Sequence, residues 1–193
     1  MRRRHREILD AAAHLMQESG YHAVSMQSVA DRAGISVGLI YQYFNNKEAL
    51  LRAVIIDILE DFHERVPAAM ERSGGDPAER LLCGFRTFCE VIAAKPEATV
   101  LAYRESKTLS REGRDQMKDL EIKTSLPLKR AVIDGIEAGL FTEDFNPDLV
   151  VHNLVLVAHG WALKHWNLAP TFSLEEYVGQ QFELLLRAIR VPA

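Results

Sequence analysis

Apolar residues recur at intervals of three and four along nearly the whole chain, and no stretch alternates apolar and polar positions with a period of two. This spacing is typical of amphipathic helices and gives no sign of strands. We therefore expect an all-α protein of about nine helices. Capping residues, glycines and prolines place these helices near residues 4–19, 26–33, 37–44, 46–72, 77–95, 96–109, 110–140, 147–167 and 174–190.

Three local signals give details of this arrangement. Asn45 and Glu48 have the spacing of a capping box, which would open the fourth helix. Pro127 lies inside the segment 110–140 and should kink or split it, because proline cannot donate a helical hydrogen bond. Gly139 supplies a residue that tolerates the left-handed conformation and should end the same segment.

Residues 25–47 predict two short helices joined by a tight turn. Ser25 can cap the first helix, because its hydroxyl can accept a hydrogen bond from an unpaired amide at the helix start. Gly34 provides the left-handed residue that stops this helix, and Ser36 can cap the next one. This order of signals is that of a helix-turn-helix.

The second of these helices has two different faces. Ile40 and Phe44 share the inner face, whereas Gly38 and Gln42 point outward. A helix that enters the major groove of DNA needs a face without bulk and side chains that hydrogen-bond base edges, and Gly38 and Gln42 meet these two needs. An ordinary helical hairpin with an exposed polar face is the alternative. The residues expected to contact DNA are Ser25, Gln27, Ser36, Val37, Gly38, Leu39, Tyr41, Gln42, Tyr43 and Lys47.

Three segments together resemble the tetracycline-repressor (TetR/AcrR) family of bacterial transcription factors: Ala33-Gly34-Ile35-Ser36, Leu39-Ile40-Tyr41-Gln42-Tyr43-Phe44 and Asn46-Lys47-Glu48-Ala49-Leu50-Leu51. The resemblance implies a homodimer that binds a palindromic operator, with a helical C-terminal domain that dimerises and holds a small-molecule inducer. It assigns groove-facing positions to Val37, Gly38, Leu39, Tyr41 and Gln42, and phosphate contacts to Tyr43 and Lys47. Leu39 replaces a common Thr or Ser, and an apolar side chain there can pack on a thymine methyl.

The charge distribution agrees with an N-terminal DNA contact. Residues 1–47 hold six basic and four acidic side chains, whereas the remainder holds seventeen basic and twenty-three acidic ones. An acidic body repels DNA, so the contact should fall to the N-terminal part. We expect a helix-turn-helix DNA-binding domain at residues 1–46 and a regulatory and dimerisation domain at 47–193. Arg2, Arg3 and Arg4 either lie on the DNA backbone or form a frayed, solvated start.

The last two helices are the expected dimer surface. The stretch 149–158 is apolar nearly all round, and the final helix adds a further apolar face that includes Tyr177 and Phe182. A monomer could cover only part of this surface, whereas pairing with a second copy as a four-helix bundle would bury the excess. Coverage by other helices of the same chain is the alternative.

An apolar cavity in the body is the expected ligand site. Each of its candidate residues is an ordinary core residue in the alternative interpretation. The segment Tyr103 to Lys107 resembles a subset of the family that responds to acyl-CoA thioesters or related lipids, with basic groups that meet phosphates. The candidates are Phe85, Phe88, Cys89, Tyr103, Arg104, Met117, Leu120, His159 and Trp166.

Other function classes lack their sequence signals. The chain has no Gly-rich phosphate loop and no nucleophile elbow, so we expect neither an enzyme nor a cofactor. His152 and His159 lie two helical turns apart, and Cys83 and Cys89 lie six residues apart, which predicts no metal site and no disulfide. No run of 18 apolar residues and no signal peptide is visible, so a cytoplasmic protein without a membrane contact is expected. A helical lipid-binding or carrier protein is the rival interpretation.

Overall fold

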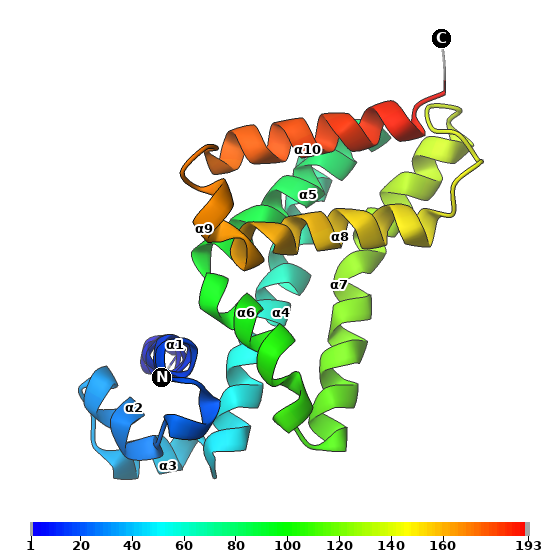
Figure 1. Cartoon of the computed structure of the whole chain (residues 1–193). Helices are drawn as coiled ribbons and strands as arrows, with labels where there is room; N and C mark the ends of the chain where they lie inside the picture. The colour runs from blue at the N-terminus through cyan, green and yellow to red at the C-terminus, as the bar shows by residue number, and fades with distance from the viewer. Residues whose placement is uncertain (1, 192–193) are drawn as a thin grey trace. The chain divides into compact units, whose positions relative to one another are not determined.

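The computed structural model describes residues 2–191, and these residues form ten α-helices and two short 3-10 segments (Figure 1). The predicted all-α class is confirmed. In chain order the elements are α1 (Arg2–Ser19), η1 (Tyr21–Ala23), α2 (Met26–Ala33), α3 (Val37–Tyr43), α4 (Lys47–Arg72), α5 (Pro77–Ala94), α6 (Pro96–Glu105), η2 (Ser106–Thr108), α7 (Arg111–Glu137), α8 (Pro147–Leu163), α9 (His165–Leu168) and α10 (Leu174–Ile189).

The helices group into two compact units. Unit 1 runs to Ile58 and adds Pro96–Asp119, whereas unit 2 holds Leu59–Lys95 and the chain from Leu120 onward. Unit 1 therefore contains the helix-turn-helix, the first turns of α4, all of α6 and the start of α7. It extends beyond the domain predicted at residues 1–46 because α6 packs against α1. The predicted division at residue 46 stays a prediction.

The core of unit 1 is built from one face of each N-terminal helix. In α1, Ile8, Ala12 and Met16 recur every four residues and are fully buried. They lie on a single helical stripe, as the sequence pattern predicts. Helix α2 packs against α1 and α3, and Val29 and Ile40 are fully buried. This packing fixes the helix-turn-helix on the first helix.

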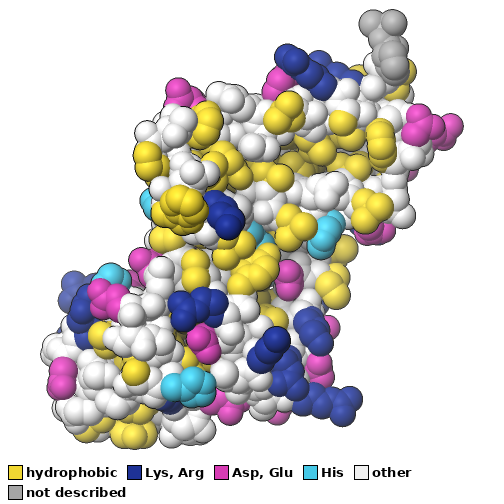
Figure 2. Space-filling model, in the orientation of Figure 1, with side chains coloured by type: hydrophobic (Ala, Val, Ile, Leu, Met, Phe, Trp, Pro, Cys, Tyr) yellow, Lys and Arg dark blue, Asp and Glu magenta, His cyan; other side chains and the backbone are white. Residues whose placement is uncertain are grey.

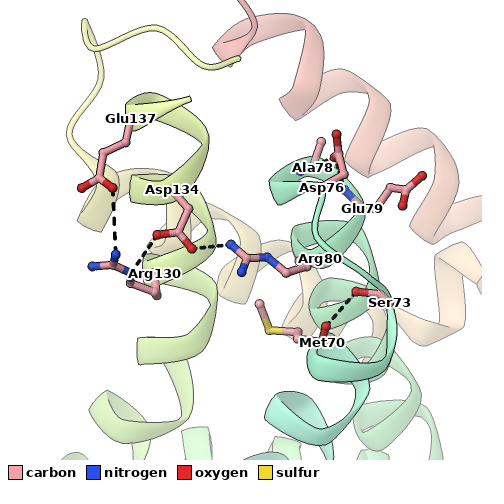
Figure 3. Close-up of polar contacts among 9 residues, drawn as sticks. All are labelled: Met70, Ser73, Asp76, Ala78, Glu79, Arg80, Arg130, Asp134 and Glu137. Atoms are coloured by element: carbon pink, nitrogen blue, oxygen red, sulfur yellow. Dashed lines mark hydrogen bonds and ion pairs between the residues drawn. The ribbon is translucent and has the colours of Figure 1, made fainter. Parts of the chain in front are cut away.

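The core of unit 2 is aromatic, and its helix ends are linked by charged groups. Phe62 of α4 stacks on Phe88 of α5, with ring centroids 4.0 Å apart. Helix α5 also packs against α8 and α10. Figure 3 shows Arg80 at the start of α5 paired with Asp134 of α7, which also pairs with Arg130 at 2.7 Å. The pair of Arg80 and Asp134 links the N-terminal end of α5 to the C-terminal part of α7, and Arg130 supports Asp134 from within α7.

The start of α4 differs from the predicted capping box. The side chain that caps this helix is that of Asn46, whose Oδ1 accepts a hydrogen bond from the Ala49 amide at 2.8 Å. The Glu48 carboxylate accepts a hydrogen bond from the Ser110 amide instead. The predicted pair of Asn45 and Glu48 is therefore wrong, because the helix begins at Lys47 and its cap is Asn46, one residue later than predicted.

Two prolines lie inside continuous helices. Helix α7 runs through Pro127 without being split, so that prediction is wrong in its stronger form. The residues that follow Pro127 in α7 are buried in the core of unit 2, including Leu128 and Val132, and this packing holds the helix together. Helix α4 likewise runs through Pro67, which the periodicity did not single out.

Other helix ends follow local signals or depart from them by a few residues. Gly139 has a φ of 70° and ends α7 as predicted, with its amide donating to the Ile136 carbonyl at 2.9 Å. The segment expected as one helix to residue 167 divides at Lys164 into α8 and the short α9. The segment expected as one helix to residue 109 ends as η2.

Candidate functional site

Local hydrogen bonds build the helix-turn-helix as the sequence predicts. Ser25 and Ser28 form a capping box at the start of α2, in which each hydroxyl accepts the other residue's amide at 3.0 Å. Gly34 has a φ of 65°, and the next amide, that of Ile35, donates to the Ala30 carbonyl at 3.0 Å. Ser36 caps α3 by accepting a hydrogen bond from the Leu39 amide at 3.2 Å. At each helix start the capping hydroxyl thus satisfies one of the amides that have no partner within the helix.

Helix α3 presents one face to unit 1 and the opposite face to solvent. Ile40 and Phe44 are buried, whereas Gly38 and Gln42 are exposed and Tyr41 is 53% exposed. Val37, Leu39 and Tyr43 are half-buried at the flanks of this face. Among the residues described, the Gln42 amide has no hydrogen-bond partner, so its donor and acceptor are free to meet another molecule.

Gly38 is not required by the fold of this chain. Its φ is not positive, and a Cβ atom added to it would meet nothing within 4 Å. Alanine would also be the better helix former at this position. The absence of a side chain therefore leaves room for a close approach by something outside the chain.

Lys47 has an internal role that the sequence did not predict. Its Nζ donates hydrogen bonds to the carbonyls of Val24 at 2.8 Å and His22 at 3.1 Å, and it lies 4.6 Å from the centroid of the Tyr21 ring. These contacts fasten η1 to the start of α4. An ammonium has three N–H donors, so at most one remains for a phosphate. The pKa of the Tyr21 hydroxyl is raised by burial and by the nearby carboxylates of Glu48 and Glu105.

Two other residues that the sequence predicts to contact DNA, Gln27 and Tyr43, also have partners within the chain. Gln27 Nε2 donates to Asp31 Oδ1 at 2.8 Å within α2, and the Tyr43 ring lies 6.0 Å from the ring of His5. At the N-terminus, α1 begins at Arg2 and not at residue 4. Arg3 and Arg4 both pair with Glu7 on the exposed side of α1, at 3.4 Å and 2.8 Å.

Four of the nine ligand candidates come together in unit 2. Phe85, Phe88, Cys89 and His159 are all buried, and the rings of Phe88 and His159 lie 6.0 Å apart. We call these four residues, with Phe62, Tyr177 and Phe182, the aromatic cluster. Sequence reasoning placed Tyr177 and Phe182 on the dimer surface, but both are buried within unit 2. The Phe182 ring stacks against the Phe85 ring at 6.3 Å.

The aromatic cluster is electrically neutral near pH 7. Burial lowers the pKa of His159 to about 4, so its imidazole is uncharged. Burial raises the pKa of the Cys89 thiol, which therefore stays protonated. Burial, and then the proximity of Cys89, raises the pKa of Tyr177 to about 12, and its hydroxyl donates to the Val157 carbonyl at 2.7 Å. The cluster thus combines apolar rings with a few neutral polar groups.

The other five ligand candidates lie elsewhere. Tyr103 and Arg104 are exposed on α6 and, like the half-buried Met117, belong to unit 1. Leu120 is half-buried where α7 enters unit 2. Trp166 is 75% exposed, because α9 is a short surface connection between α8 and α10, so its predicted place in an enclosed site is wrong.

Unit 2 leaves an apolar face uncovered along α8 and α10. Leu149, Leu156 and Leu163 are exposed and recur every seven residues on α8, and Leu184 is exposed on α10. Figure 2 shows hydrophobic side chains along these two helices. Scattered surface leucines are ordinary, but a line of them on one helix is typical of an interface. Most of the residues predicted for the dimer surface do not belong to this exposed line, since Val150, Val151 and Leu154 face the core.

Within residues 2–191, no group of three or more His, Cys, Asp or Glu side chains is arranged to hold a metal ion. In the same range, no helix combines the length and the apolar character needed to cross a bilayer.

Comparison with known sequences covers both parts of the chain. The profile of bacterial regulatory proteins of the tetR family matches residues 8–54, and that of the tetracyclin repressor-like C-terminal domain matches residues 74–189. The HTH-type transcriptional regulator HbdR of Aromatoleum sp. (strain CIB) is 38% identical over 184 residues, which are 95% of this chain and 79% of HbdR. The HTH-type transcriptional repressor KstR2 of Mycolicibacterium smegmatis is 26% identical over 91% of this chain and 85% of its own length.

Solved structures give the same fold. The ketosteroid transcriptional regulator KstR2 of Mycobacterium tuberculosis aligns with a TM-score of 0.80 at 26% identity, over 98% of this chain and 96% of its own. AibR, solved in complex with isovaleryl coenzyme A and operator DNA, aligns with a TM-score of 0.79 at 22% identity, over 95% and 98% of the two chains. With an exposed recognition helix and a match over nearly its whole length, the chain is a DNA-binding transcriptional regulator that belongs to the TetR family of bacterial regulatory proteins.

Proposed function

We propose that the chain acts in the cytoplasm as a homodimeric repressor, which binds a palindromic operator and leaves it when a small hydrophobic or acyl-CoA-like molecule binds. The observation that carries this proposal is the outward face of α3. Gly38, Tyr41 and Gln42 are exposed there, while the opposite face holds the helix in unit 1. A rigidly held helix with an uncovered polar face fits the major groove.

Each residue of this face has a separate role in the proposal. Gln42 reads a base edge through its amide, and Gly38 lets the helix axis approach the bases. Leu39, with Val37 beside it, packs on a thymine methyl. Phosphates are held by Tyr43 and by the capped helix starts at Ser25 and Ser36, with the remaining N–H of Lys47 as a further donor.

A second copy of the chain covers the apolar line on α8 and α10 in this proposal. The line of Leu149, Leu156 and Leu163 suits a symmetric contact, in which the same surface of each subunit packs against the other. Two recognition helices of such a dimer must lie about 34 to 36 Å apart to enter successive major grooves. Operator binding thus depends on the geometry of the dimer.

The ligand class is inferred from the aromatic cluster. Its neutral side chains favour an apolar group that carries at most neutral polar atoms, because an isolated charge buried there would remain unpaired. Two of the similar structures fit this class, since KstR2 is a ketosteroid transcriptional regulator and AibR was solved with isovaleryl coenzyme A. The polar part of a coenzyme A thioester would remain outside the cluster. No catalytic step is needed for this function.

Release from DNA follows from differential binding. A ligand shifts the dimer away from DNA only if it binds more tightly to the conformation that does not fit the operator. A nearly complete switch requires a preference of about ten-thousandfold. The aromatic cluster includes Phe62 of α4, and α4 directly follows the helix-turn-helix in the chain, so a change in the cluster has a covalent route to α3.

A fluorescence anisotropy titration tests the proposal. The purified chain is titrated with the DNA upstream of its own gene over a series of salt concentrations, and steep loss of affinity with salt is expected. Gln42→Ala should lose about 1–3 kcal/mol of discrimination at particular base pairs and keep its non-specific affinity. Gln27→Ala removes the same amide from a side chain that is already bonded to Asp31, and it should keep the base preference. Absent or salt-insensitive binding would favour the helical carrier.

A further inference from the structure

The connection between α6 and α7 lies beside the first turns of α4 within unit 1. The Ser110 amide donates to Glu48 Oε1 at 2.7 Å. Three residues later, a Cβ atom added to Gly113 would lie 3.3 Å from the Cδ of Arg52. Because α4 begins only a few residues after α3 ends, this contact brings a segment from the middle of the chain next to the helix-turn-helix.

Basic side chains surround this contact. Lys107 precedes Ser110 and is exposed, and Arg111 follows it with its side chain 92% exposed. Figure 2 shows Lys and Arg side chains gathered over the start of α7. Lys107 forms no ion pair with any residue in the described range. Arg111 pairs with Asp115 at 3.8 Å, an exposed contact that contributes little energy and is easily exchanged.

The neighbouring charges decide which groups could bind an anion. The segment Pro96–Asp119 holds as many acidic as basic residues, so the segment as a whole is not basic. The positive end of α7 is already matched by the Glu48 carboxylate, and the Arg114 guanidinium donates to the Leu109 carbonyl. The long side chains of Lys107 and Arg111 remain available on either side of Ser110.

We propose that Lys107 and Arg111 bind phosphates of the operator duplex beyond those reached by the helix-turn-helix. This inference rests on the proposed DNA binding and extends its surface to a second segment of the chain. Exposed Lys and Arg side chains next to a recognition helix are the usual source of backbone contacts, which position the protein and carry no base preference.

The test compares salt dependences on DNA. An operator duplex is recovered by in vitro selection with the wild-type protein, and its affinity is measured over a salt series for the wild type and for the double variant Lys107→Ala with Arg111→Ala. The slope of log K against log salt should become shallower by about 0.9 for each lost phosphate contact, and so by roughly two per subunit. Affinity should fall alike on selected and unrelated duplexes.

A matched control distinguishes the loss of these phosphate contacts from a general loss of positive charge. Lys123→Ala removes an exposed positive charge from the same helix, twelve residues after Arg111 and so about 18 Å along the helix axis. That distance exceeds the screening length of about 8 to 10 Å in ordinary buffers. The slope of this variant should equal that of the wild type, and Lys107→Arg should also keep the wild-type slope.

Failure of this inference can be distinguished from failure of the proposed function. If the wild type selects and binds an operator but the double variant keeps the wild-type slope, the inference is wrong and the proposed function stands. If the double variant keeps that slope but loses affinity for free coenzyme A in a calorimetric titration, the two residues serve a small molecule, which also overturns the inference. If the wild type binds no selected duplex, the proposed function and this inference both fail.

Discussion

At the scale of single residues, two helical glycines lack a side chain for different physical reasons. A Cβ atom on Gly135 of α7 would overlap the ring of buried Phe141, so the core of unit 2 needs glycine there. A Cβ atom on Gly38 of α3 would meet open space. The first glycine is explained by packing within the chain, whereas the second has no such explanation.

Alanine substitution separates these two explanations. Gly135→Ala should lower the free energy of unfolding by about 1–3 kcal/mol, because a rigid buried ring must move. Gly38→Ala should raise it by up to about 1 kcal/mol, because alanine is the better helix former, and should weaken operator binding. Urea denaturation and anisotropy titration measure the two effects. Unchanged operator binding by Gly38→Ala would remove the argument for a close approach to the bases.

Buried His159 makes stability depend on pH. Its pKa is about 4 in the folded chain and about 6.5 when unfolded, so between these values the unfolded chain binds the extra proton. Stability is therefore complete above pH 6.5 and declines as the pH falls toward 4. Between pH 7 and pH 5 this residue should cost about 2 kcal/mol, measured by urea denaturation. The free energy of unfolding of His159→Gln should decline correspondingly less over this pH range. An equal decline in the wild type and the variant would assign the effect to other groups.

At the scale of elements, local signals were sufficient for the helix-turn-helix. Ser25, Gly34 and Ser36 act on amides within a few residues of themselves, and all three have the predicted geometry. The predicted cap of α4 lies one residue too early, at Asn45 in place of Asn46. The bonds made by Glu48 and Lys47 depend on partners more than twenty residues away, namely Ser110 and Val24. Capping rules contain no information about such partners.

Helix α7 shows how tertiary packing overrides a local rule. Proline in a helix interior removes one hydrogen bond and crowds the preceding turn, at a cost of about 3 kcal/mol. Thr124 and Ser125 donate their hydroxyls back to the carbonyls of Glu121 and Ile122, which also favours a bend just before Pro127. The helix nevertheless continues, because the turns after Pro127 are buried.

Pro127→Ala tests whether the proline inside α7 still lowers the stability of the folded chain. The change restores an amide donor for the Lys123 carbonyl and should raise the free energy of unfolding by about 1–2 kcal/mol, after allowing for the greater freedom of the unfolded chain. Thermal and urea unfolding measure it. A loss of stability would mean that the packing of the following turns requires the proline.

At the scale of the whole molecule, the sequence predicted the class of fold but not which faces of α8 and α10 are buried. Helix α8 is apolar nearly all round, so its periodicity could not distinguish the side facing α5 from the side left open. Tyr177 and Phe182 of α10 are buried in unit 2, whereas Leu156 of α8 is exposed. The same ambiguity affected the ligand candidates, because an aromatic residue such as Trp166 has equal apolar character in a core and on a surface.

The exposed line on α8 makes the proposed dimer testable. Leu156 is 46% exposed at the centre of this line, and an aspartate there would place two like charges near the symmetry axis of a paired α8. Leu156→Asp should therefore sediment as a monomer in analytical ultracentrifugation. Operator affinity should fall with it, because separate subunits lose the high effective concentration that a dimer gives its second half-site.

Leu140→Asp is the matched control for this experiment. Leu140 is 40% exposed in the connection between α7 and α8, outside the line of Leu149, Leu156 and Leu163, so the same charge there should leave both the sedimentation and the operator affinity unchanged. Dissociation by both variants would point to a general effect of added charge. A Leu156→Asp protein that still sediments as a dimer would place the subunit contact on another surface, and the seven-residue spacing of the exposed leucines would then need another explanation.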